Sequence, residues 1–235
     1  MSEGSNLLAA LREEDRAVLD PYLETCEFQA GQILYEPGDT VDYCHLPCGH
    51  AVGSFFVMLE SGVSVETVMV GREGALGGIV SQGRMPAYAR SCVMHEGQFY
   101  RISAVDLEEA KSQSINIRHL FARYADCLMA QVFQSVACNA IHTIEQRAAK
   151  WLCAAVERTG DSDIAMTQEQ LASMMGIGRS YASRVIQRFK HDGLVKTRRG
   201  GLDVLDHDRL LLHACSCNEL VRGHFETVLR GVYPD

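Results

Sequence analysis

The chain has 235 residues, enough for one large domain or two small ones, and 47% of them are hydrophobic, an ordinary share for a folded soluble protein. No apolar run approaches the length that crosses a bilayer, and the first residues lack the basic start and apolar core of a secretory signal. We therefore expect a cytoplasmic protein that makes no contact with a membrane.

The formal net charge of -8 argues against nucleic-acid binding when it is averaged over the chain. The acidic excess lies in residues 1–100, however, and residues 176–200 carry seven basic residues against one acid, Asp192. A basic patch on an otherwise acidic chain is typical of a surface that binds phosphates. The charge alone would also fit a solvated helix face, so the sequence motifs must distinguish between these two interpretations.

The first hundred residues change character near residue 26. Residues 6–25 carry leucine and valine at helical spacing and predict an amphipathic helix. Short segments rich in Val, Phe, Tyr and Ile then alternate with glycines, which predicts a small antiparallel sandwich or barrel. Strands are expected near 32–36, 42–46, 50–59, 64–70, 87–94 and 97–102.

A long helical region follows, because no glycine occurs between Ser103 and Gly160. Within it, side chains at spacings of 4, 3, 4, 3 and 4 form a heptad-like seam. We predict that this seam pairs with a second chain, although a helix packed on the preceding β domain of its own chain would show the same spacing. The candidate dimerisation residues are Leu120, Tyr124, Cys127, Gln131, Gln134 and Cys138. A second helix is expected at about 142–158.

Residues 165–205 carry the signals of two short helices and a hairpin. Thr167 followed three residues later by Gln170 is a capping box, and Gly176 suits the left-handed conformation that ends a helix. A second helix starts at Arg179 or Ser180, and a basic hairpin follows with its turn at 200–201. This order predicts a winged helix-turn-helix that binds double-stranded DNA.

The start of the second helix of such a motif meets base edges in the major groove, where arginine pairs bidentately with guanine. Basic residues elsewhere in the motif suit phosphates. The candidate DNA-binding residues are Thr167, Gln168, Gln170, Arg179, Ser180, Tyr181, Ser183, Arg184, Arg188, Lys196, Arg198 and Arg199. A three-helix module that docks another protein is the alternative interpretation.

Through these motifs the chain resembles the cyclic-AMP receptor/fumarate–nitrate regulator (CRP/FNR) superfamily over almost its whole length. The strongest local match is LASMMGIGRSYASRVIQRFKHDGLV, and VGREGALGG is also typical of that superfamily. In its fumarate–nitrate branch the recognition helix carries Glu-x-x-Ser-Arg. Ser183 and Arg184 match the last two positions and Ser180 replaces the glutamate, so a different DNA half-site is expected.

The resemblance implies an α+β fold with three parts. These are an N-terminal antiparallel β-roll of the cyclic-nucleotide-binding type with an N-terminal helix (1–115), a dimerisation helix (116–140), and a C-terminal winged helix-turn-helix with a helical tail (141–235). It also implies a non-enzymatic homodimer that binds a palindromic promoter site and contacts RNA polymerase. An effector-independent regulator and a thiol redox enzyme are alternatives, but no C-x-x-C, nucleophile elbow or Gly-rich phosphate loop supports the enzyme.

In the relatives that bind cyclic nucleotides, a Gly-Glu pair grips the ribose and an Arg-Ser pair grips the phosphate. Here the first pair reads Gly77-Gly78, and our alignment places Met85 and Pro86 at the second. A phosphate that is buried without a counter-charge is costly. We therefore predict that the chain does not bind cyclic AMP, since Arg84 would serve only in a shifted register.

Nine cysteines are many for such a chain, and we expect most of them to be buried as small apolar residues. The segment CHLPCGH, residues 44–50, nevertheless combines two cysteines and two histidines, which suit zinc, haem or iron–sulfur clusters. The candidate metal or redox residues are Cys26, Cys44, His45, Cys48 and His50. Because side chains alternate along a strand, this segment alone would not supply four ligands.

Two other cysteines, Cys215 and Cys217, lie in the C-terminal tail. We expect this tail to be helical, so the two side chains would diverge, and chelation by this pair alone is not expected. His119 and His142 lie near the long helix, but nothing in the sequence distinguishes them from ordinary side chains. The cofactor and the signal are therefore left open by the sequence.

Overall fold

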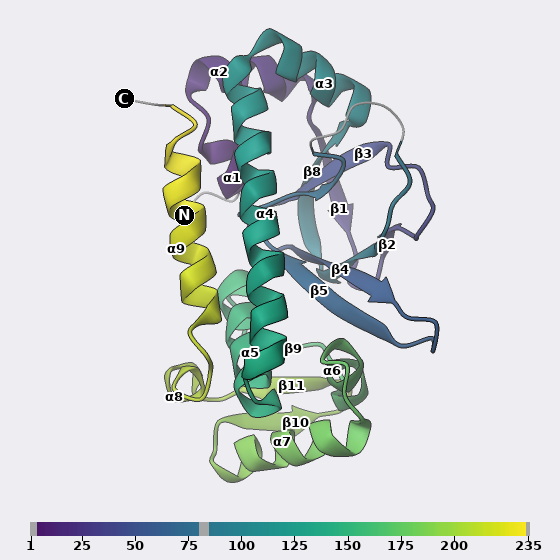
Figure 1. Ribbon diagram of the computed structural model, residues 1–235, viewed down its shortest axis with the longest axis vertical. Coiled ribbons are helices and arrows are strands. Elements are labelled where there is room, and N and C mark those ends of the chain that lie inside the picture. The colour runs from purple at the N-terminus through teal and green to yellow at the C-terminus, as the bar shows by residue number, and fades with distance from the viewer. Residues whose placement is uncertain (1–3, 80–84, 234–235) are drawn as a thin grey trace.

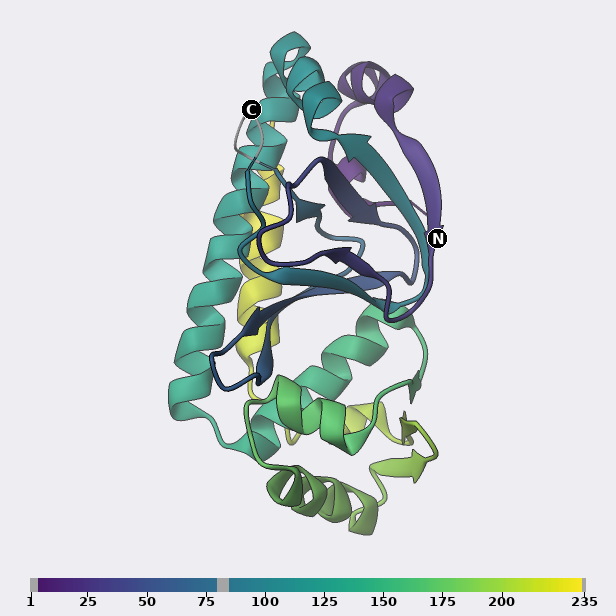
Figure 2. The same cartoon turned by 90° about the vertical axis from the view of Figure 1, so that its right-hand side faces the viewer.

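The computed structural model describes residues 4–79 and 85–233 and shows a β-sandwich beside one long helix, α4 (Figure 1). A smaller helical domain lies beneath the sandwich at the C-terminal end of α4 (Figure 2). The α+β class predicted from the sequence is confirmed, with antiparallel sheets first, the long helix next and the helix-turn-helix last.

The N-terminal segment does not form the single helix expected over 6–25. It forms α1 (Asn6–Ala9), α2 (Glu13–Leu19), the 3-10 helix η1 (Asp20–Tyr22) and a first strand, β1 (Glu24–Phe28). Arg12 has an extended backbone (φ -66°, ψ 158°), which separates the two helices. Each short helix thus buries its own leucines, a turn that leucine spacing alone does not reveal.

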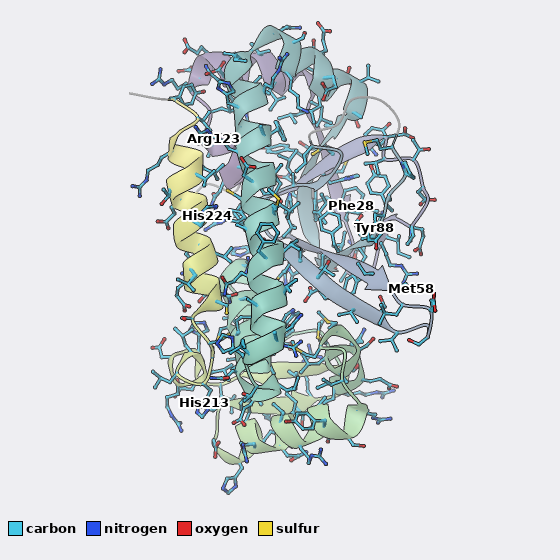
Figure 3. The ribbon with its side chains drawn as sticks, in the orientation of Figure 1. Phe28, Met58, Tyr88, Arg123, His213 and His224 are labelled. Atoms are coloured by element: carbon cyan, nitrogen blue, oxygen red, sulfur yellow. The ribbon has the colours of Figure 1, made fainter. Side chains whose placement is uncertain are left out.

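Two four-stranded antiparallel sheets form the sandwich, in the orders β1-β8-β3-β6 and β2-β7-β4-β5. The remaining strands are β2 (Ile33–Tyr35), β3 (Tyr43–Pro47), β4 (Val52–Met58), β5 (Ser64–Val70), β6 (Leu76–Gly77), β7 (Arg90–His95) and β8 (Gly97–Ser103). All six expected strands are found. Phe28 points into the sandwich, whereas Met58 points outward at the end of β4 (Figure 3).

The long helical region begins with two helices, α3 (Ala104–Gln113) and α4 (Ile115–Ile141), separated by Ser114. Ser114 is extended and accepts a hydrogen bond from the backbone N–H of Ile117, so it caps α4. No helix within residues 4–79 and 85–233 is both long and apolar enough to span a membrane.

The C-terminal domain contains the predicted winged helix-turn-helix. Its elements are α5 (Ile144–Thr159), β9 (Asp163–Ile164), α6 (Gln168–Met174), α7 (Arg179–His191), β10 (Val195–Arg198) and β11 (Gly201–Val204). After α8 (His207–Leu211), the last helix α9 (Cys217–Arg230) runs back along α4 (Figure 1). Phe225 of α9 packs edge-on against Tyr124 of α4, with ring centroids 6.2 Å apart.

The two domains share a hydrophobic core rather than meeting at a loose linker. Val52 and Met69 of the sandwich belong to the same buried cluster as Trp151 and Met174 of the C-terminal domain. Polar contacts cross the same boundary, because the Ser173 hydroxyl donates to the carbonyl oxygen of Ser64 at 2.9 Å. The helix-turn-helix is therefore held in one orientation against β4 and β5.

Candidate functional site

The helix-turn-helix is fixed at both ends of its first helix. The backbone N–H of Gln170 donates to the Thr167 hydroxyl at 3.1 Å, and the Gln170 side chain accepts from the Thr167 N–H at 2.8 Å. Gly176 has a positive φ of 65°, which turns the chain toward α7. The capping box and the glycine turn are both as predicted.

Helix α7 buries one face and leaves the other open. Ile186 and Phe189 are fully buried, so the opposite face of the helix is directed to solvent. Ser180, Tyr181 and Arg184 are exposed on this face, and Ser183 is half-buried. The Arg184 guanidinium lies 5.1 Å from the centre of the Tyr181 ring, a cation–π contact that orients both side chains.

The other basic candidates fall into two groups. Arg188 pairs with Glu145 at 2.6 Å and Arg198 pairs with Asp163 at 2.5 Å, so both side chains already have a partner. Lys196 and Arg199 are exposed in the hairpin and have no ion pair among the described residues. These two are better suited to meet phosphates without breaking an internal contact.

A hollow of about 400 Å³ lies between the start of α6, the start of α7 and the hairpin. Gln168 and Arg179 line it on the helix side, and Arg198 lines it on the hairpin side. Arg179 is 76% exposed and stands 4.0 Å from Glu169. The hollow adjoins α7 directly, because Arg179 is the first residue of that helix.

The six residues predicted to form a dimer seam are turned inward instead. Leu120, Tyr124, Cys127 and Cys138 are buried within the chain, each at most 1% exposed. The other two, Gln131 and Gln134, donate hydrogen bonds to the Met69 carbonyl oxygen and to the Cys217 sulfur. This burial contradicts their assignment to a dimer contact, because α4 packs that face on its own sandwich and on α9.

The candidate metal residues of the sandwich do not converge. Cys44 points into the core beneath α4, and burial raises the pKa of its thiol to about 12. His45 points the opposite way, with its ring centroid 5.5 Å from that of Phe28. Cys26 lies on β1, where it pairs with Phe99 of β8. Cys48 is buried just after β3, and His50 is exposed.

One group of at least three metal-ligating side chains meets in the described part of the chain, and it contains none of those five residues. It consists of Cys138, His142, Cys215 and Cys217. From the sequence, Cys215 and Cys217 are considered only as a pair, and neither is linked to Cys138 or His142. Their grouping depends on the return of the chain after α8, which the sequence does not reveal.

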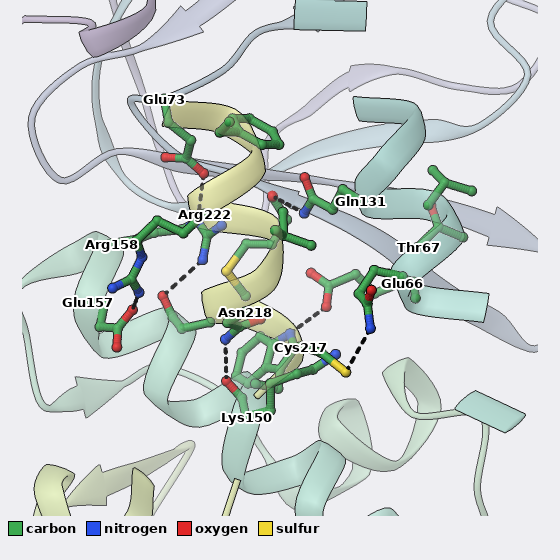
Figure 4. Close-up of a pocket in the computed structure, with 18 of the residues that line it drawn as sticks. Glu66, Thr67, Glu73, Gln131, Lys150, Glu157, Arg158, Cys217, Asn218 and Arg222 are labelled. Carbon is green, nitrogen blue, oxygen red and sulfur yellow. Dashed lines mark hydrogen bonds and ion pairs between the residues drawn. The ribbon is translucent and has the colours of Figure 1, made fainter. Parts of the chain in front are cut away.

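A cavity of about 750 Å³ lies between β5, α4, α5 and α9 (Figure 4). Its wall carries both signs of charge, with Glu73 paired to Arg158 at 2.8 Å and Lys150 nearby. The Arg158 charge lowers the pKa of Glu73 against the opposing effect of its burial. No sequence signal marks this cavity, because its wall comes from four elements that are distant in the chain.

The positions that hold cyclic nucleotides in relatives look different here. Gly77 has a positive φ of 117°, and a Cβ on it would lie 2.3 Å from the Tyr43 carbonyl oxygen, so this turn requires glycine. Gly78 offers no carboxylate for a ribose, and Met85 is 44% exposed. Arg84 lies outside the described residues.

A winged helix-turn-helix with an exposed basic face is typical of a DNA-binding domain. Residues 146–212 match the family model of the Crp-like helix-turn-helix domain. This part of the chain is therefore a Crp-like helix-turn-helix domain. A domain of this kind favours a transcription regulator over the thiol redox enzyme considered above.

Solved structures share the fold at low sequence identity. FixK2 from Bradyrhizobium japonicum is 12% identical, with a TM-score of 0.67, and the match covers 82% of this chain and 98% of that one. A CRP-family regulator from Thermus thermophilus is 16% identical, with a TM-score of 0.67 over 80% and 96% of the two chains. A crp/fnr-family protein from Eubacterium rectale is 18% identical, with a TM-score of 0.60 over 95% and 97%. None of the curated proteins matches the sequence significantly.

Proposed function

We propose that the chain is a dimeric, sequence-specific transcription regulator that reads a palindromic promoter site through α7. The exposed polar face of α7 carries this proposal, because the helix is otherwise anchored by buried residues and shows Ser180, Tyr181 and Arg184 to solvent. Arg184 is our candidate for bidentate contact with guanine. Thr167, Gln168 and Gln170 at the start of α6 and Lys196 and Arg199 in the hairpin would contact the DNA backbone.

The dimer would form through a different face of α4 from the one first predicted. Met129, Phe133 and Val136 are 49%, 65% and 65% exposed, an unusual exposure for large apolar side chains. With Ala122, Asp126 and Ala140 they repeat at spacings of 4, 3, 4, 3 and 4, which fits a two-stranded coiled coil. Two copies joined there would present two α7 helices, which must lie about 34 Å apart to reach successive major grooves.

The proposal names a candidate pocket for an effector but does not name the effector. The cavity between β5, α4, α5 and α9 is our candidate for an effector pocket, since an occupant would touch both domains at once. Cyclic AMP is not our candidate, because Gly78 and Met85 stand where relatives hold the ribose and the phosphate. Contact with RNA polymerase belongs to the same proposal and would place the protein in the cytoplasm, with the promoter DNA.

Selection of bound duplexes from a random DNA library tests the proposal, and should return a motif with two-fold symmetry. Arg184→Ala should then weaken binding to the selected motif by about 10- to 100-fold, which corresponds to roughly 1–3 kcal/mol for one bidentate contact. Binding to unrelated duplexes should change little. Arg230→Ala, which removes an exposed arginine from the end of α9, is the control with the same change of charge. Absence of any enriched motif would contradict the proposal.

A further inference from the structure

Four potential metal ligands converge where the long helix meets the DNA-binding domain. Cys138 lies in the last turn of α4 and His142 is the C-cap of that helix, one turn further on. Cys215 and Cys217 come from the segment between α8 and the start of α9. The four ligand atoms all lie within 4.8 Å of one another. These four residues are called the Cys–His cluster below.

Two of the distances within the Cys–His cluster match those of a tetrahedral metal site. The sulfurs of Cys138 and Cys215 are 3.6 Å apart, and the Cys217 sulfur is 3.5 Å from Nδ1 of His142. In a zinc site with Zn–S of about 2.3 Å and Zn–N of about 2.0 Å, two sulfurs are roughly 3.8 Å apart, and a sulfur and a nitrogen roughly 3.5 Å. These two pairs already stand close to the spacing that a single ion requires, and all four ligand atoms lie within 4.8 Å of one another.

We propose that Cys138, His142, Cys215 and Cys217 bind one zinc ion, as a structural site with three thiolates and one imidazole. Cys₃His is one of the standard ligand sets of structural zinc. Zinc binding would release the three thiol protons to solvent, because the metal takes the thiolate form.

Ordinary packing does not explain this arrangement. The three cysteines form a buried cluster of their own, separate from the three larger apolar cores. The polar neighbours are those that a negatively charged zinc–thiolate centre needs. Gln134 directs its side-chain amide at the Cys217 sulfur (3.2 Å), and the Lys150 ammonium lies 3.4 Å from the Cys138 sulfur. Such outer contacts orient metal ligands and balance their charge.

An iron–sulfur cluster and a disulfide are the two alternatives for these residues, and each fits them less well than a single zinc ion. An iron–sulfur cluster contains several metal ions, so it holds its ligands further apart than a single ion does. A disulfide between Cys138 and Cys215 would bring their sulfurs to about 2.05 Å and leave Cys217 and His142 without a role. Both alternatives are outcomes of the experiment below.

The position of the site has a consequence for regulation, which rests on the proposed DNA binding. The chain leaves the Cys–His cluster at His142 and returns to it at Cys215, so the helix-turn-helix and the hairpin lie in the loop 143–214 that the ion closes. Zinc would also hold the start of α9 against the end of α4. Loading the site would therefore fix the orientation of α7 relative to α4, and loss of zinc would weaken binding to a palindromic site.

Metal analysis of protein purified without a histidine tag or chelator tests the site directly. We expect about one zinc per chain and, after exchange with cobalt, the visible absorption of a tetrahedral cobalt–thiolate centre. Cys217→Ser and His142→Ala should lose most of the metal. Cys153→Ser removes another fully buried thiol outside the cluster, and Cys44→Ser with Cys48→Ser removes the cysteines of the sandwich. Both control variants should keep the zinc.

A wild-type protein that neither contains zinc nor takes up zinc or cobalt would overturn the proposal, whatever the variants do. So would iron with sulfide, a Cys138–Cys215 disulfide in protein purified under reducing conditions, or loss of zinc from the Cys44 and Cys48 variant. DNA affinity is measured separately before and after zinc removal. Bound zinc without any DNA binding would refute the proposed function alone. A protein that binds DNA but takes up no zinc would refute only the site, and unchanged DNA affinity after zinc removal would refute the regulatory consequence.

Discussion

His45 shows how the surroundings of a residue in the β-sandwich decide its chemistry. It is 5% exposed, and its ring lies among those of Phe28 and Tyr35, with centroids 5.5 and 5.8 Å away. Burial, assisted by the positive charge of Arg101, lowers its pKa to about 4. The imidazole is therefore neutral at physiological pH, and it acts as part of an aromatic core.

This environment predicts a loss of stability in mild acid. Between pH 6.5 and about 4 the unfolded chain binds a proton on His45 that the folded chain does not, so the free energy of unfolding falls as the pH is lowered. The loss is up to roughly 3 kcal/mol over this interval. His45→Phe keeps a flat ring without a titrating group, and should remove this part of the acid sensitivity in urea unfolding at pH 7 and pH 5.

The control for this prediction is His224→Phe, since His224 lies exposed on α9 (Figure 3). That variant should keep the pH dependence of the wild type. If His45→Phe loses as much stability between pH 7 and pH 5 as the wild type does, the acid sensitivity arises elsewhere and the account of His45 is wrong.

At the scale of elements, α4 shows which sequence signals determine structure. Its heptad spacing occurs twice, once through Tyr124 and Cys127 and once through Met129 and Phe133. Spacing predicts a helix with a packed face, but it does not say whether that face meets the same chain or another. Gln131 and Gln134 in the first series are typical neither of a hydrophobic core nor of a coiled-coil seam. Their hydrogen bonds to Met69 and Cys217 become apparent only in the folded structure.

Sequence motifs predict the structure correctly where the interactions behind them are local. The capping box of Thr167 and the turn at Gly176 need only neighbouring residues, so the sequence predicts them correctly. The break at Arg12 and the Cys–His cluster depend on contacts between distant segments. Cys215 precedes α9 rather than lying within it, so its side chain turns toward Cys217 instead of diverging as a helix would require.

The second face of α4 gives a prediction about assembly. Phe133→Glu places a charge in the middle of the proposed coiled-coil face, where it would meet its own copy across the two-fold axis. The mass in solution should fall from that of a dimer toward that of one 26.0 kDa chain. Light scattering coupled to size-exclusion chromatography measures this change.

Val105→Glu is the matched control, because Val105 on α3 is 79% exposed and lies outside the proposed contact. It should leave the dimer intact. A second variant, Leu220→Glu, changes an exposed position of α9. Dissociation by Leu220→Glu but not by Phe133→Glu would assign the dimer contact to α9.

At the scale of the whole molecule, the two domains are held together by a shared core, and a half-buried acid, Glu66, lies beside it at the wall of the cavity. Glu66 on β5 accepts hydrogen bonds from the Ser54 hydroxyl at 2.5 Å and from the indole N–H of Trp151 on α5. Burial raises the pKa of Glu66, and these two hydrogen bonds offset only part of that effect. A charge at this position thus weakens a contact on which the orientation of α7 depends.

Replacing this carboxylate separates its charge from its hydrogen bonds. Because the folded-state pKa of Glu66 is raised, its contribution to stability is present below the unfolded-state value and is lost as the pH rises through the folded-state value. Glu66→Gln keeps an oxygen that can accept from Ser54 or Trp151, so at pH 8 its free energy of unfolding should equal or exceed that of the wild type. Glu66→Ala leaves the buried donors without an acceptor and should cost about 1–3 kcal/mol at every pH. Chemical unfolding at pH 5 and pH 8 distinguishes the two variants. If Glu66→Gln were as destabilised as Glu66→Ala at pH 8, the ionised carboxylate would be stabilising this domain contact.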